Sequence, residues 1–545
     1  VKELLSVAIG GSQRFGSWML DAVGQRNDNR LDEPNDYWEF QSGTTTFGPD
    51  TFRVQDDGTV AITSTGRNRQ DPSFQNFRRV RFHEQLTQED SYIGTADARR
   101  DFVLNRSVPG FIKFGAKFTR TSRETDIAEP TYNVGSQVWT AAQVTSATAG
   151  AFQNPIPLRA MPNLWLDIDD LSAFFGTNGN DPRYFAYDAA NSFLTEHQSD
   201  FSLRERVVAA YAMSKIGFGR LSLVGGLRVE STKVDSTANT IVTQNGQRTA
   251  RPIDGGGSYV NLLPSLVGTL GLRSNLVARA AFTTAVGRPE FDVLAPRSQL
   301  GIEDNPAIGT VGTLTIGNPD LKARHSNNVD LSLEWYFSEG AIASVAFFNK
   351  SISNEIIPAP TDRRTNYVFE GQRFDRFDLN TTVNAEDAFV RGVELTLAHQ
   401  LRFLPAPFNG LGFGGSLTLL DSGVDVERDA QVLTLPLLEQ ADRSTSLTLY
   451  YQKGRWDVSG TYKYNANFWT DYGASRSLDL DQGSFARFDC RLQFDLTRDI
   501  KLNFSGINLN DEPTSEFQGG NRSWNTEYEY TGRTFLLGIS ARLGR

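Results

Sequence analysis

Residues 486–496 read ARFDCRLQFDL, in which apolar and polar side chains alternate without a break. Successive side chains of a β-strand point to opposite faces of the sheet, so this stretch predicts a strand with one apolar and one charged face. Its eleven residues match the length of a strand that crosses a membrane at a tilt. The alternative is a soluble antiparallel protein in which such apolar faces meet in a core.

The same alternation recurs along the chain. We count fourteen strands from Phe111 onward and predict five more before it, near residues 4–9, 17–26, 54–63, 77–86 and 92–103. Nineteen is an odd total, whereas bacterial single-chain barrels normally have an even number of strands. The apolar positions that define the clearest strands are Ile112, Phe114, Ala116, Phe118; Val207, Ala209, Tyr211, Met213; Leu221, Leu223, Leu227, Val229; Leu276, Ala278, Ala280, Phe282; Leu331, Leu333, Trp335, Phe337; Val393, Leu395, Leu397; Trp456, Val458, Tyr462; and Phe535, Leu537, Ile539, Ala541, Leu543.

The connections between these strands alternate between tight and long. Short turns at one end and long loops at the other are typical of an outer-membrane barrel, whereas a sandwich has no reason to sort its loops in this way. We therefore predict an all-β transmembrane antiparallel β-barrel with short periplasmic turns and long extracellular loops, closed so that every backbone group is paired in the bilayer. The tight links lie near 217–219, 273–274, 338–340, 453–455 and 497–499, and the long segments are 120–205, 231–258, 285–327, 351–388, 421–443, 465–483 and 510–532.

Composition excludes several other classes of protein. Hydrophobic residues make up 39% of the chain and no run approaches the roughly 18 apolar residues of a membrane-spanning helix. The net charge of −10 disfavours nucleic acid as a partner. Cys490 is the only cysteine, and the histidines are too scattered for a structural zinc site. No phosphate loop, nucleophile elbow or HExxH motif occurs, so we predict no enzyme activity, cofactor or bound metal.

Several fragments resemble the barrel of TonB-dependent receptors. Residues 259–265 read YVNLLPS and are followed by GRPEF at 287–291, and GNPDLK at 317–322 precedes NNVDL at 327–331. The stretches FFNK at 347–350 and RGVEL at 391–395 fit the next two strands, and the ending is similar in GINLNDE at 506–512 and YTGRTF at 530–535. Each fragment is weak alone, and their order along the chain carries the resemblance.

The resemblance implies a 22-stranded barrel in the bacterial outer membrane, with an N-terminal plug in its lumen. It also implies import of a scarce large solute (a siderophore, cobalamin or an oligosaccharide) with energy from the TonB-ExbB-ExbD complex. Implied partners are outer-membrane lipid and lipopolysaccharide. No plug or TonB box is visible near Val1, and residues 541–545 read ARLGR without a terminal aromatic residue. We therefore expect residues 1–545 to be the barrel, with the plug and possibly the first strands outside this sequence.

Three other functions stay open at this stage. A passive porin-like channel would share the barrel and lack the plug. An outer-membrane enzyme would need clustered Ser, His and Asp residues or paired carboxylates; the four scattered histidines argue against the first arrangement and leave the second open. A soluble all-β adhesin would explain the alternation by core packing.

Candidate functional residues come in two groups. Tryptophans in long loops offer flat faces to sugar rings or aromatic siderophores, although ordinary loop packing also accounts for them. Charged residues on the polar face of the strands are candidates for the lumen, where salt bridges between strands are the alternative role. The first group is Trp139, Trp165, Trp469 and Trp524, and the second is Arg487, Asp489, Arg491, Glu394, Lys113 and Lys117.

One long loop carries a helical pattern. Leu164, Ile168, Leu171 and Phe175 recur at helical spacing and predict a short amphipathic helix within residues 120–205. Three aspartates, at 167, 169 and 170, lie nearby. A solvated helix face explains these carboxylates better than a calcium site, because the full ligand spacing is missing.

Overall fold

The computed structural model of this chain describes most of its residues. The described residues are 2–42, 50–54, 60–64, 71–105, 107–144, 166–244, 247–305, 307–359, 362–369, 371–428, 431–473 and 475–542.

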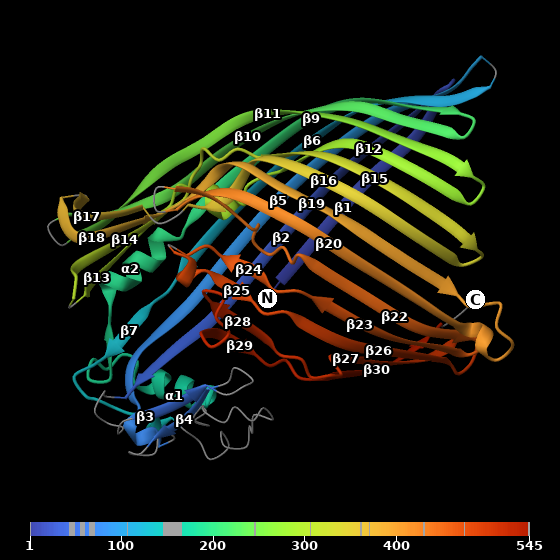
Figure 1. The fold of residues 1–545 in the computed structure, drawn as a ribbon. Coiled ribbons are helices and arrows are strands. Elements are labelled where there is room, and N and C mark those ends of the chain that lie inside the picture. Colours follow the sequence, from blue (N-terminus) through green and yellow to red (C-terminus); the bar gives the residue numbers. More distant parts are fainter. Residues whose placement is uncertain are drawn as a thin grey trace.

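One large antiparallel sheet dominates the described part of the chain. Seventeen of its twenty strands follow one another as a meander, and the sheet curls into a barrel wall (Figure 1). The wall runs from β1, which pairs with β2 alone, to β30, which pairs with β27 alone among the described residues. In order, the wall strands are β1 (Lys2–Phe15), β2 (Trp18–Gln41), β5 (Asn76–Leu104), β6 (Val108–Ala128), β9 (Phe201–Phe218), β10 (Leu221–Gln244), β11 (Gln247–Arg273), β12 (Leu276–Gly287), β15 (Arg324–Ser338), β16 (Ala341–Pro358), β19 (Thr382–Gln400), β20 (Leu411–Arg428), β22 (Arg443–Lys453), β23 (Trp456–Asn465), β26 (Phe485–Asp495), β27 (Ile500–Ile507) and β30 (Thr534–Ala541).

The fourteen strands expected after Phe111 correspond to β6 through β30 of this wall, but the expectation for the earlier part was wrong in two places. Residues 77–86 and 92–103 belong to one 29-residue strand, β5, because its pairing with β2 continues without a break through the polar stretch between them. Residues 54–63 contribute to a separate hairpin of β3 (Asp50–Val54) and β4 (Val60–Ser64), not to the wall. In the described part of the chain the wall therefore has seventeen strands, whereas the sequence pattern predicted nineteen.

The two ends of the wall differ as the loop lengths predict. Short turns gather at one end, beside the C-terminus, and the longer connections gather at the other (Figure 1). The loop end carries most of the remaining secondary structure, and three short strands extend the large sheet there. These are β7 (Thr131–Val134), β8 (Phe185–Tyr187) and β21 (Gln431–Leu435).

Two further sheets of four strands and several short helices complete the described elements. The first sheet holds β13 (Ser298–Asn305), β14 (Gly309–Ile316), β17 (Asp362–Phe369) and β18 (Gln372–Asn380), and the second holds β24 (Phe468–Asp471), β25 (Leu480–Gln482), β28 (Thr514–Gln518) and β29 (Asn525–Glu529). The helices are α1 (Ile168–Asn178), α2 (Ala189–Gln198) and α3 (Phe291–Leu294), with short 3-10 turns η1 (Pro72–Phe74), η2 (Ala141–Gln143), η4 (Phe408–Gly410) and η5 (Arg476–Leu478).

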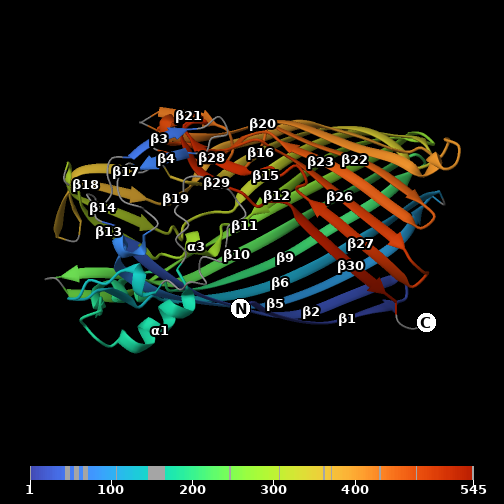
Figure 2. The same cartoon turned by 90° about the horizontal axis from the view of Figure 1, so that it is seen from below.

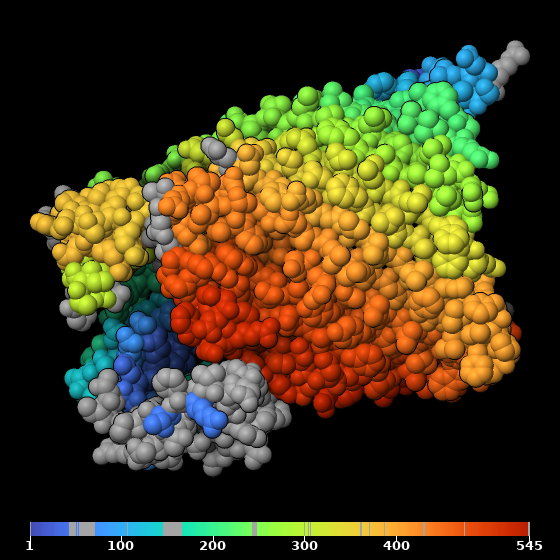
Figure 3. Space-filling view, viewed as in Figure 1, coloured from blue at the N-terminus to red at the C-terminus, as the bar shows by residue number. Residues whose placement is uncertain are grey.

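The alternating apolar residues lie on the outside of the wall. Phe114, Leu331, Leu395 and Phe488 are 47%, 49%, 43% and 42% exposed. Side chains of this size would be enclosed if two sheets packed face to face. In space-filling view the strands coloured yellow to red form a continuous wall (Figure 3). This exposure excludes the soluble sandwich and fits a sheet whose apolar face meets lipid.

In strand β9 the expected outer face was wrong. We predicted that Val207, Ala209, Tyr211 and Met213 form its apolar outer face, but Val207 and Ala209 are buried, and the neighbouring Val208 is exposed and pairs with Phe118 of β6. Residues 207–213 read VVAAYAM and are apolar in both registers except for the tyrosine hydroxyl. Alternation alone cannot choose a face in such a stretch, so pairing with β6 decides it.

Buried apolar clusters lie at the loop end. One joins Phe77 and Val80 of β5 to Trp139, Leu171 and Phe185. Another forms around Phe374 and Phe377 of β18. These clusters give the long connections a packed interior, so the described loops have defined shapes that can position a site.

Helix α1 confirms the helical pattern within residues 120–205. Its described apolar members, Ile168, Leu171 and Phe175, lie in the helix, and Leu164 lies outside the described residues. Asp167 caps the helix by accepting hydrogen bonds from the backbone N–H groups of Asp169 and Asp170, at 2.9 and 3.4 Å. This capping accounts for Asp167, and Asp169 and Asp170 lie in the first turn of the helix, where carboxylates are favourable.

Candidate substrate-binding site

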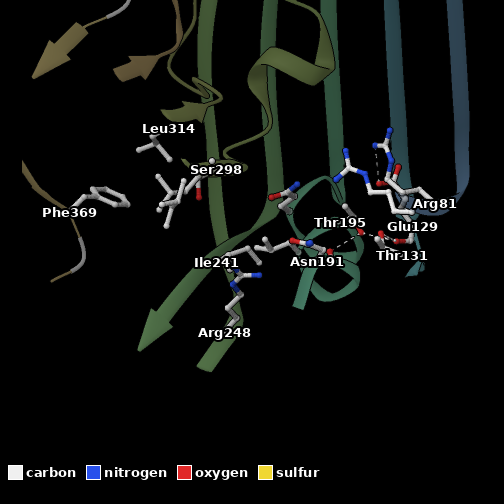
Figure 4. A pocket seen from close by; sticks show the side chains of 16 residues that line it. Arg81, Glu129, Thr131, Asn191, Thr195, Ile241, Arg248, Ser298, Leu314 and Phe369 are labelled. Atoms are coloured by element: carbon white, nitrogen blue, oxygen red, sulfur yellow. Dashed lines mark hydrogen bonds and ion pairs between the residues drawn. The ribbon is translucent and has the colours of Figure 1, made fainter. Parts of the chain in front are cut away.

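A cavity of about 360 Å³ lies at the loop end, between the wall and the sheet of β13 and β14 (Figure 4). Strand β5 contributes Arg79 and Arg81, and the β10–β11 hairpin contributes Ile241 and Arg248. Helix α2 lines another side, and Leu300, Leu314 and Phe369 supply an apolar side. Apolar walls with a few convergent polar groups are typical of small-molecule sites, and the volume lies at the lower end of their usual range.

The arginines of β5 are held by two carboxylates. Glu39 of β2 accepts a hydrogen bond from Nε of Arg79 at 2.8 Å and contacts Nη2 of Arg81 at 3.5 Å. Glu129, which follows β6, lies 3.5 Å from Nη1 of Arg81 and 3.0 Å from Nδ1 of His83. The alternation of β5 places Arg79, Arg81 and His83 on one face, and Arg79 and Arg81 line the cavity together with Glu129.

Helix α2 is anchored beside them. Its N-cap Asp188 accepts a hydrogen bond from the backbone N–H of Asn191 at 3.0 Å. Burial opposes ionisation of Asp188, but hydrogen bonds from Asn191 and Asn133 outweigh it and hold the pKa of this carboxyl below its usual value. Thr195 donates a hydrogen bond to the backbone carbonyl of Glu129 at 3.2 Å. The helix is therefore fixed to the end of β6.

Arg248 completes the cavity from the other side. Its Nη1 donates a hydrogen bond to the carbonyl of Ala190 at 2.8 Å, which ties β11 to α2. No carboxylate pairs with Arg248 among the described residues. Of the charged residues that line the cavity, three are arginines and one, Glu129, is a carboxylate. Glu39 and Glu129 offset Arg79 and Arg81, so the formal charge of these groups together is +1. The remaining charge is that of Arg248, and it makes the cavity attractive to an anionic ligand.

The four candidate tryptophans lie in different surroundings. Trp139 is buried, with its ring stacked on Phe77 at 4.4 Å between centroids, so loop packing occupies the faces proposed for a substrate. Trp165 lies outside the described residues. The guanidinium of Arg476 lies 4.2 Å from the ring centroid of Trp469, and Trp524 is exposed. None of the three described tryptophans lines the arginine cavity.

The six charged candidates stand on the face of the wall opposite to Phe114 and Phe488. Lys113 pairs with Asp97 at 3.4 Å, Arg487 donates to Thr514 at 3.0 Å, and Asp489 accepts from the backbone N–H of Asn508 at 2.9 Å. The Lys113–Asp97 pair is a salt bridge between neighbouring strands, β6 and β5, which is the structural alternative for this group. The remaining candidates are Arg491, which donates to Gln493 at 3.4 Å, and the exposed Glu394 and Lys117.

Sequence reasoning missed the cavity arginines and a second charged cluster. The signal for the first was FRRVRFH at residues 77–83, where cationic side chains alternate along one strand. The second cluster joins Arg288, from the GRPEF stretch, to Glu230. Glu205 lies 3.7 Å from Nε of Arg288, and Arg228 pairs with Glu230 at 2.6 Å. This cluster binds β9, β10 and the end of β12 together.

Among the described residues, no helix has the length and apolar character needed to cross a membrane. The same residues contain no group of three or more His, Cys, Asp or Glu side chains suited to a metal ion.

Comparison with known proteins places these features in a family context. The family model described as "TonB dependent receptor-like, beta-barrel" matches residues 17–509. No curated protein matches. Among solved structures, the ferric-catecholate import receptor Fiu of E. coli K12, in its closed form, aligns with a TM-score of 0.56 and 14% identity over 99% of this chain. The siderophore receptor PiuA of Acinetobacter baumannii aligns with a TM-score of 0.57 and 11% identity, also over 99% of this chain.

A further neighbour is the ferric citrate transporter FecA in unliganded form, with a TM-score of 0.52 and 12% identity over 99% of this chain and 70% of its own. The chain spans 64% of the length of the Fiu and PiuA chains. At these identities the likeness shows a shared fold. The matching family and these neighbours are receptors and transporters, not enzymes.

Proposed function

Because this chain belongs to the TonB-dependent receptor family, we propose that it forms the barrel of an outer-membrane receptor that binds a scarce solute and imports it with energy from the TonB-ExbB-ExbD complex. We further propose that the solute is an anionic metal chelate of the siderophore class. The single observation that carries this choice is the cavity at the loop end, where Arg248 has no carboxylate partner among the described residues.

The chemistry of the cavity favours a chelate over the other solutes considered. Guanidinium groups make charge-assisted hydrogen bonds to carboxylate or catecholate oxygens, and Arg248 has no carboxylate partner among the described residues. Phe369 and Leu300 offer an apolar side for the body of the ligand. An uncharged oligosaccharide would leave the charge of Arg248 without a counterion. In this proposal Arg487, Asp489, Arg491, Glu394, Lys113 and Lys117 line the path through the lumen.

Variants of the cavity arginines test the substrate class. We expect Arg248→Gln to weaken binding of an anionic ferric chelate about 10-fold or more, since hydrogen bonds to charged groups contribute about 1.5–3 kcal/mol. Binding to cells that express the receptor from its native gene is measured with radioactive iron in ferric citrate, a ferric catecholate and a neutral ferric hydroxamate. The matched control is Arg78→Gln, because Arg78 also contacts Glu39, at 3.6 Å, but does not line the cavity.

The same cells separate energised import from a passive channel. We expect uptake of the anionic chelate to cease when the proton gradient is collapsed or TonB is deleted, while binding persists. Uptake that continues unchanged in both conditions would favour the porin-like alternative. If Arg248→Gln and Arg78→Gln bind every anionic chelate as the wild type does, the proposed substrate class is wrong.

A further inference from the structure

Cations gather at the short turns of the wall, at the end that lies beside the C-terminus (Figure 1). Within two residues of these turns, the described residues include nine cations and four carboxylates, a net charge of +5, whereas the whole chain carries −10. The charge of this end is therefore opposite in sign to that of the chain. The cations are Arg14, Arg220, Arg273, Arg402, Lys453, Arg455, Arg498, Lys501 and Arg542, and the carboxylates are Glu339, Asp457, Asp495 and Asp499.

The carboxylates of this end neutralise only part of its charge. Lys501 lies 3.3 Å from Asp495, and Arg402 pairs with Glu339. Asp499 adjoins Arg498 in the sequence without forming an ion pair with it. Four exposed arginines in or beside the turns have no ion pair with any described residue, and we call them the turn arginines. They are Arg220, Arg273, Arg455 and Arg498.

The turn arginines form two neighbouring pairs. Nη1 of Arg220 donates a hydrogen bond to the carbonyl of Leu272 at 3.2 Å, and Leu272 directly precedes Arg273. Arg455 and Arg498 lie on the turns that follow β22 and β26, and the strands β23 and β26 between these turns are hydrogen-bonded neighbours. Like charges that lie close together in a sheet destabilise it. An external anion beside each pair would relieve this repulsion.

The two pairs are too far apart for one compact anion. From β12, beside the first pair, to β22, beside the second, the wall takes five steps between hydrogen-bonded strands. At about 4.8 Å per step, this distance is about 24 Å along the wall. Figure 2 shows the wall curving from the green strands of the first pair to the orange and red strands of the second. A partner that contacts both pairs must therefore be extended.

The turn arginines lie beyond the aromatic residues of the lipid-facing surface. Phe218, the last residue of β9, is 50% exposed, and Trp456, the first residue of β23, is 47% exposed. Exposed aromatic side chains at the ends of membrane-spanning elements mark the level of the headgroups. Arg220 and Arg455 lie in the turns themselves, past these rings. With the short turns on the periplasmic side, these arginines face the periplasm.

We propose that the turn arginines bind peptidoglycan, the extended polymer of the periplasm whose peptide stems carry free carboxylates. A guanidinium group binds a carboxylate through two parallel hydrogen bonds. Contacts that are weak one by one give stable attachment when the carboxylates belong to one linked polymer. The inference rests on the proposed outer-membrane placement and not on the proposed substrate. It adds attachment to the cell wall to the proposed import.

Co-sedimentation with isolated peptidoglycan sacculi tests the proposal. The receptor is purified in a neutral detergent from the outer membranes of cells that express it from its native gene. We expect the wild type to pellet with the sacculi at about 0.1 M salt and to be released at about 1 M salt, where the Debye length falls from about 10 Å to about 3 Å. Replacement of all four turn arginines by Gln should lower the apparent affinity at least about tenfold, because the linked contacts are lost together.

The matched control makes the same change of net charge away from the short turns. Four exposed arginines that each pair with an aspartate are replaced by Gln, and this variant should bind sacculi as the wild type does. A further variant with Lys at all four turn positions keeps the charge and should retain most of the binding. Heat-modifiable migration checks that every variant is folded. The control positions are Arg26, Arg183, Arg364 and Arg391.

Three further arms identify the partner and the side of the membrane. Sacculi whose carboxylates are amidated should no longer pellet the wild type. Native mass spectrometry should show equal retention of phosphatidylglycerol by the wild type and the folded Gln variant. In a Cys490→Ser background, Ser274→Cys, next to Arg273, should react with an impermeant maleimide only after the outer membrane is permeabilised.

Four results would each overturn the proposal. They are equal sedimentation of the wild type and the folded Gln variant, undiminished binding to amidated sacculi, loss of phosphatidylglycerol by the Gln variant, and labelling of position 274 in intact cells. Uptake of a ferric chelate by cells that carry the Gln variant keeps the two proposals apart. Loss of sacculus binding with normal uptake would leave the proposed import intact.

Discussion

Strands β26 and β9 lie in the same wall, yet their sequences specify it to different degrees. In β26, Phe488 and Leu492 alternate with Asp489 and Arg491, so only one face can meet lipid. In β9, residues 207–213 are apolar in both registers, and the outward face is set by pairing with Phe118 and its neighbours on β6. The comparison teaches that alternation determines orientation only when the second face is polar.

A charge on the outer face of β26 should have the largest effect. We expect Leu492→Arg to destabilise the folded barrel by about 2–4 kcal/mol, because the arginine would enter hydrocarbon near the middle of the apolar band. Equilibrium unfolding in urea from lipid vesicles, followed by tryptophan fluorescence, measures the change. Gln493→Arg, on the opposite face, is the control and should lower the free energy of unfolding by less than about 1 kcal/mol. Equal losses for the two variants would contradict the assigned faces.

Labelling of β9 should sharpen the comparison where the sequence is ambiguous. In a Cys490→Ser background, we expect a fluorophore on Ala212→Cys to be quenched severalfold more by spin-labelled lipid than one on Met213→Cys. The reason is that Ala212 pairs with the exposed Phe114, while Met213 pairs with Lys113 on the other face. Stronger quenching at position 213 would restore the register expected from alternation.

The smallest effect should come from removing the tyrosine hydroxyl on the inner face of β9. Tyr211 donates a hydrogen bond to Asp97 at 2.6 Å. We expect Tyr211→Phe to lower the free energy of unfolding by about 0.5–1.5 kcal/mol, the usual net value of one hydrogen bond. Asp97→Asn in the same assay completes a double-mutant cycle with Tyr211→Phe. Strict additivity of the two changes would show that this contact does not couple the strands.

Much of the wall was predictable and little of the site was. The strands after Phe111 and the sorting of the loops follow from local alternation and turn residues, which depend on neighbours in sequence. The cavity instead joins Arg79 of β5, Arg248 of β11 and Phe369 of β17. Trp139 shows the same limit, because its burial against Phe77 depends on how the loop folds back onto β5.

The amino-acid sequence by itself determined that this chain builds a wall of membrane-spanning strands, because water and hydrocarbon select opposite side chains at every second residue. Only the tertiary structure decided which face of β9 meets lipid and which arginines converge at the loop end. Both outcomes depend on strand register and loop packing. These are set by contacts between residues far apart in the chain, so no local pattern of side chains records them.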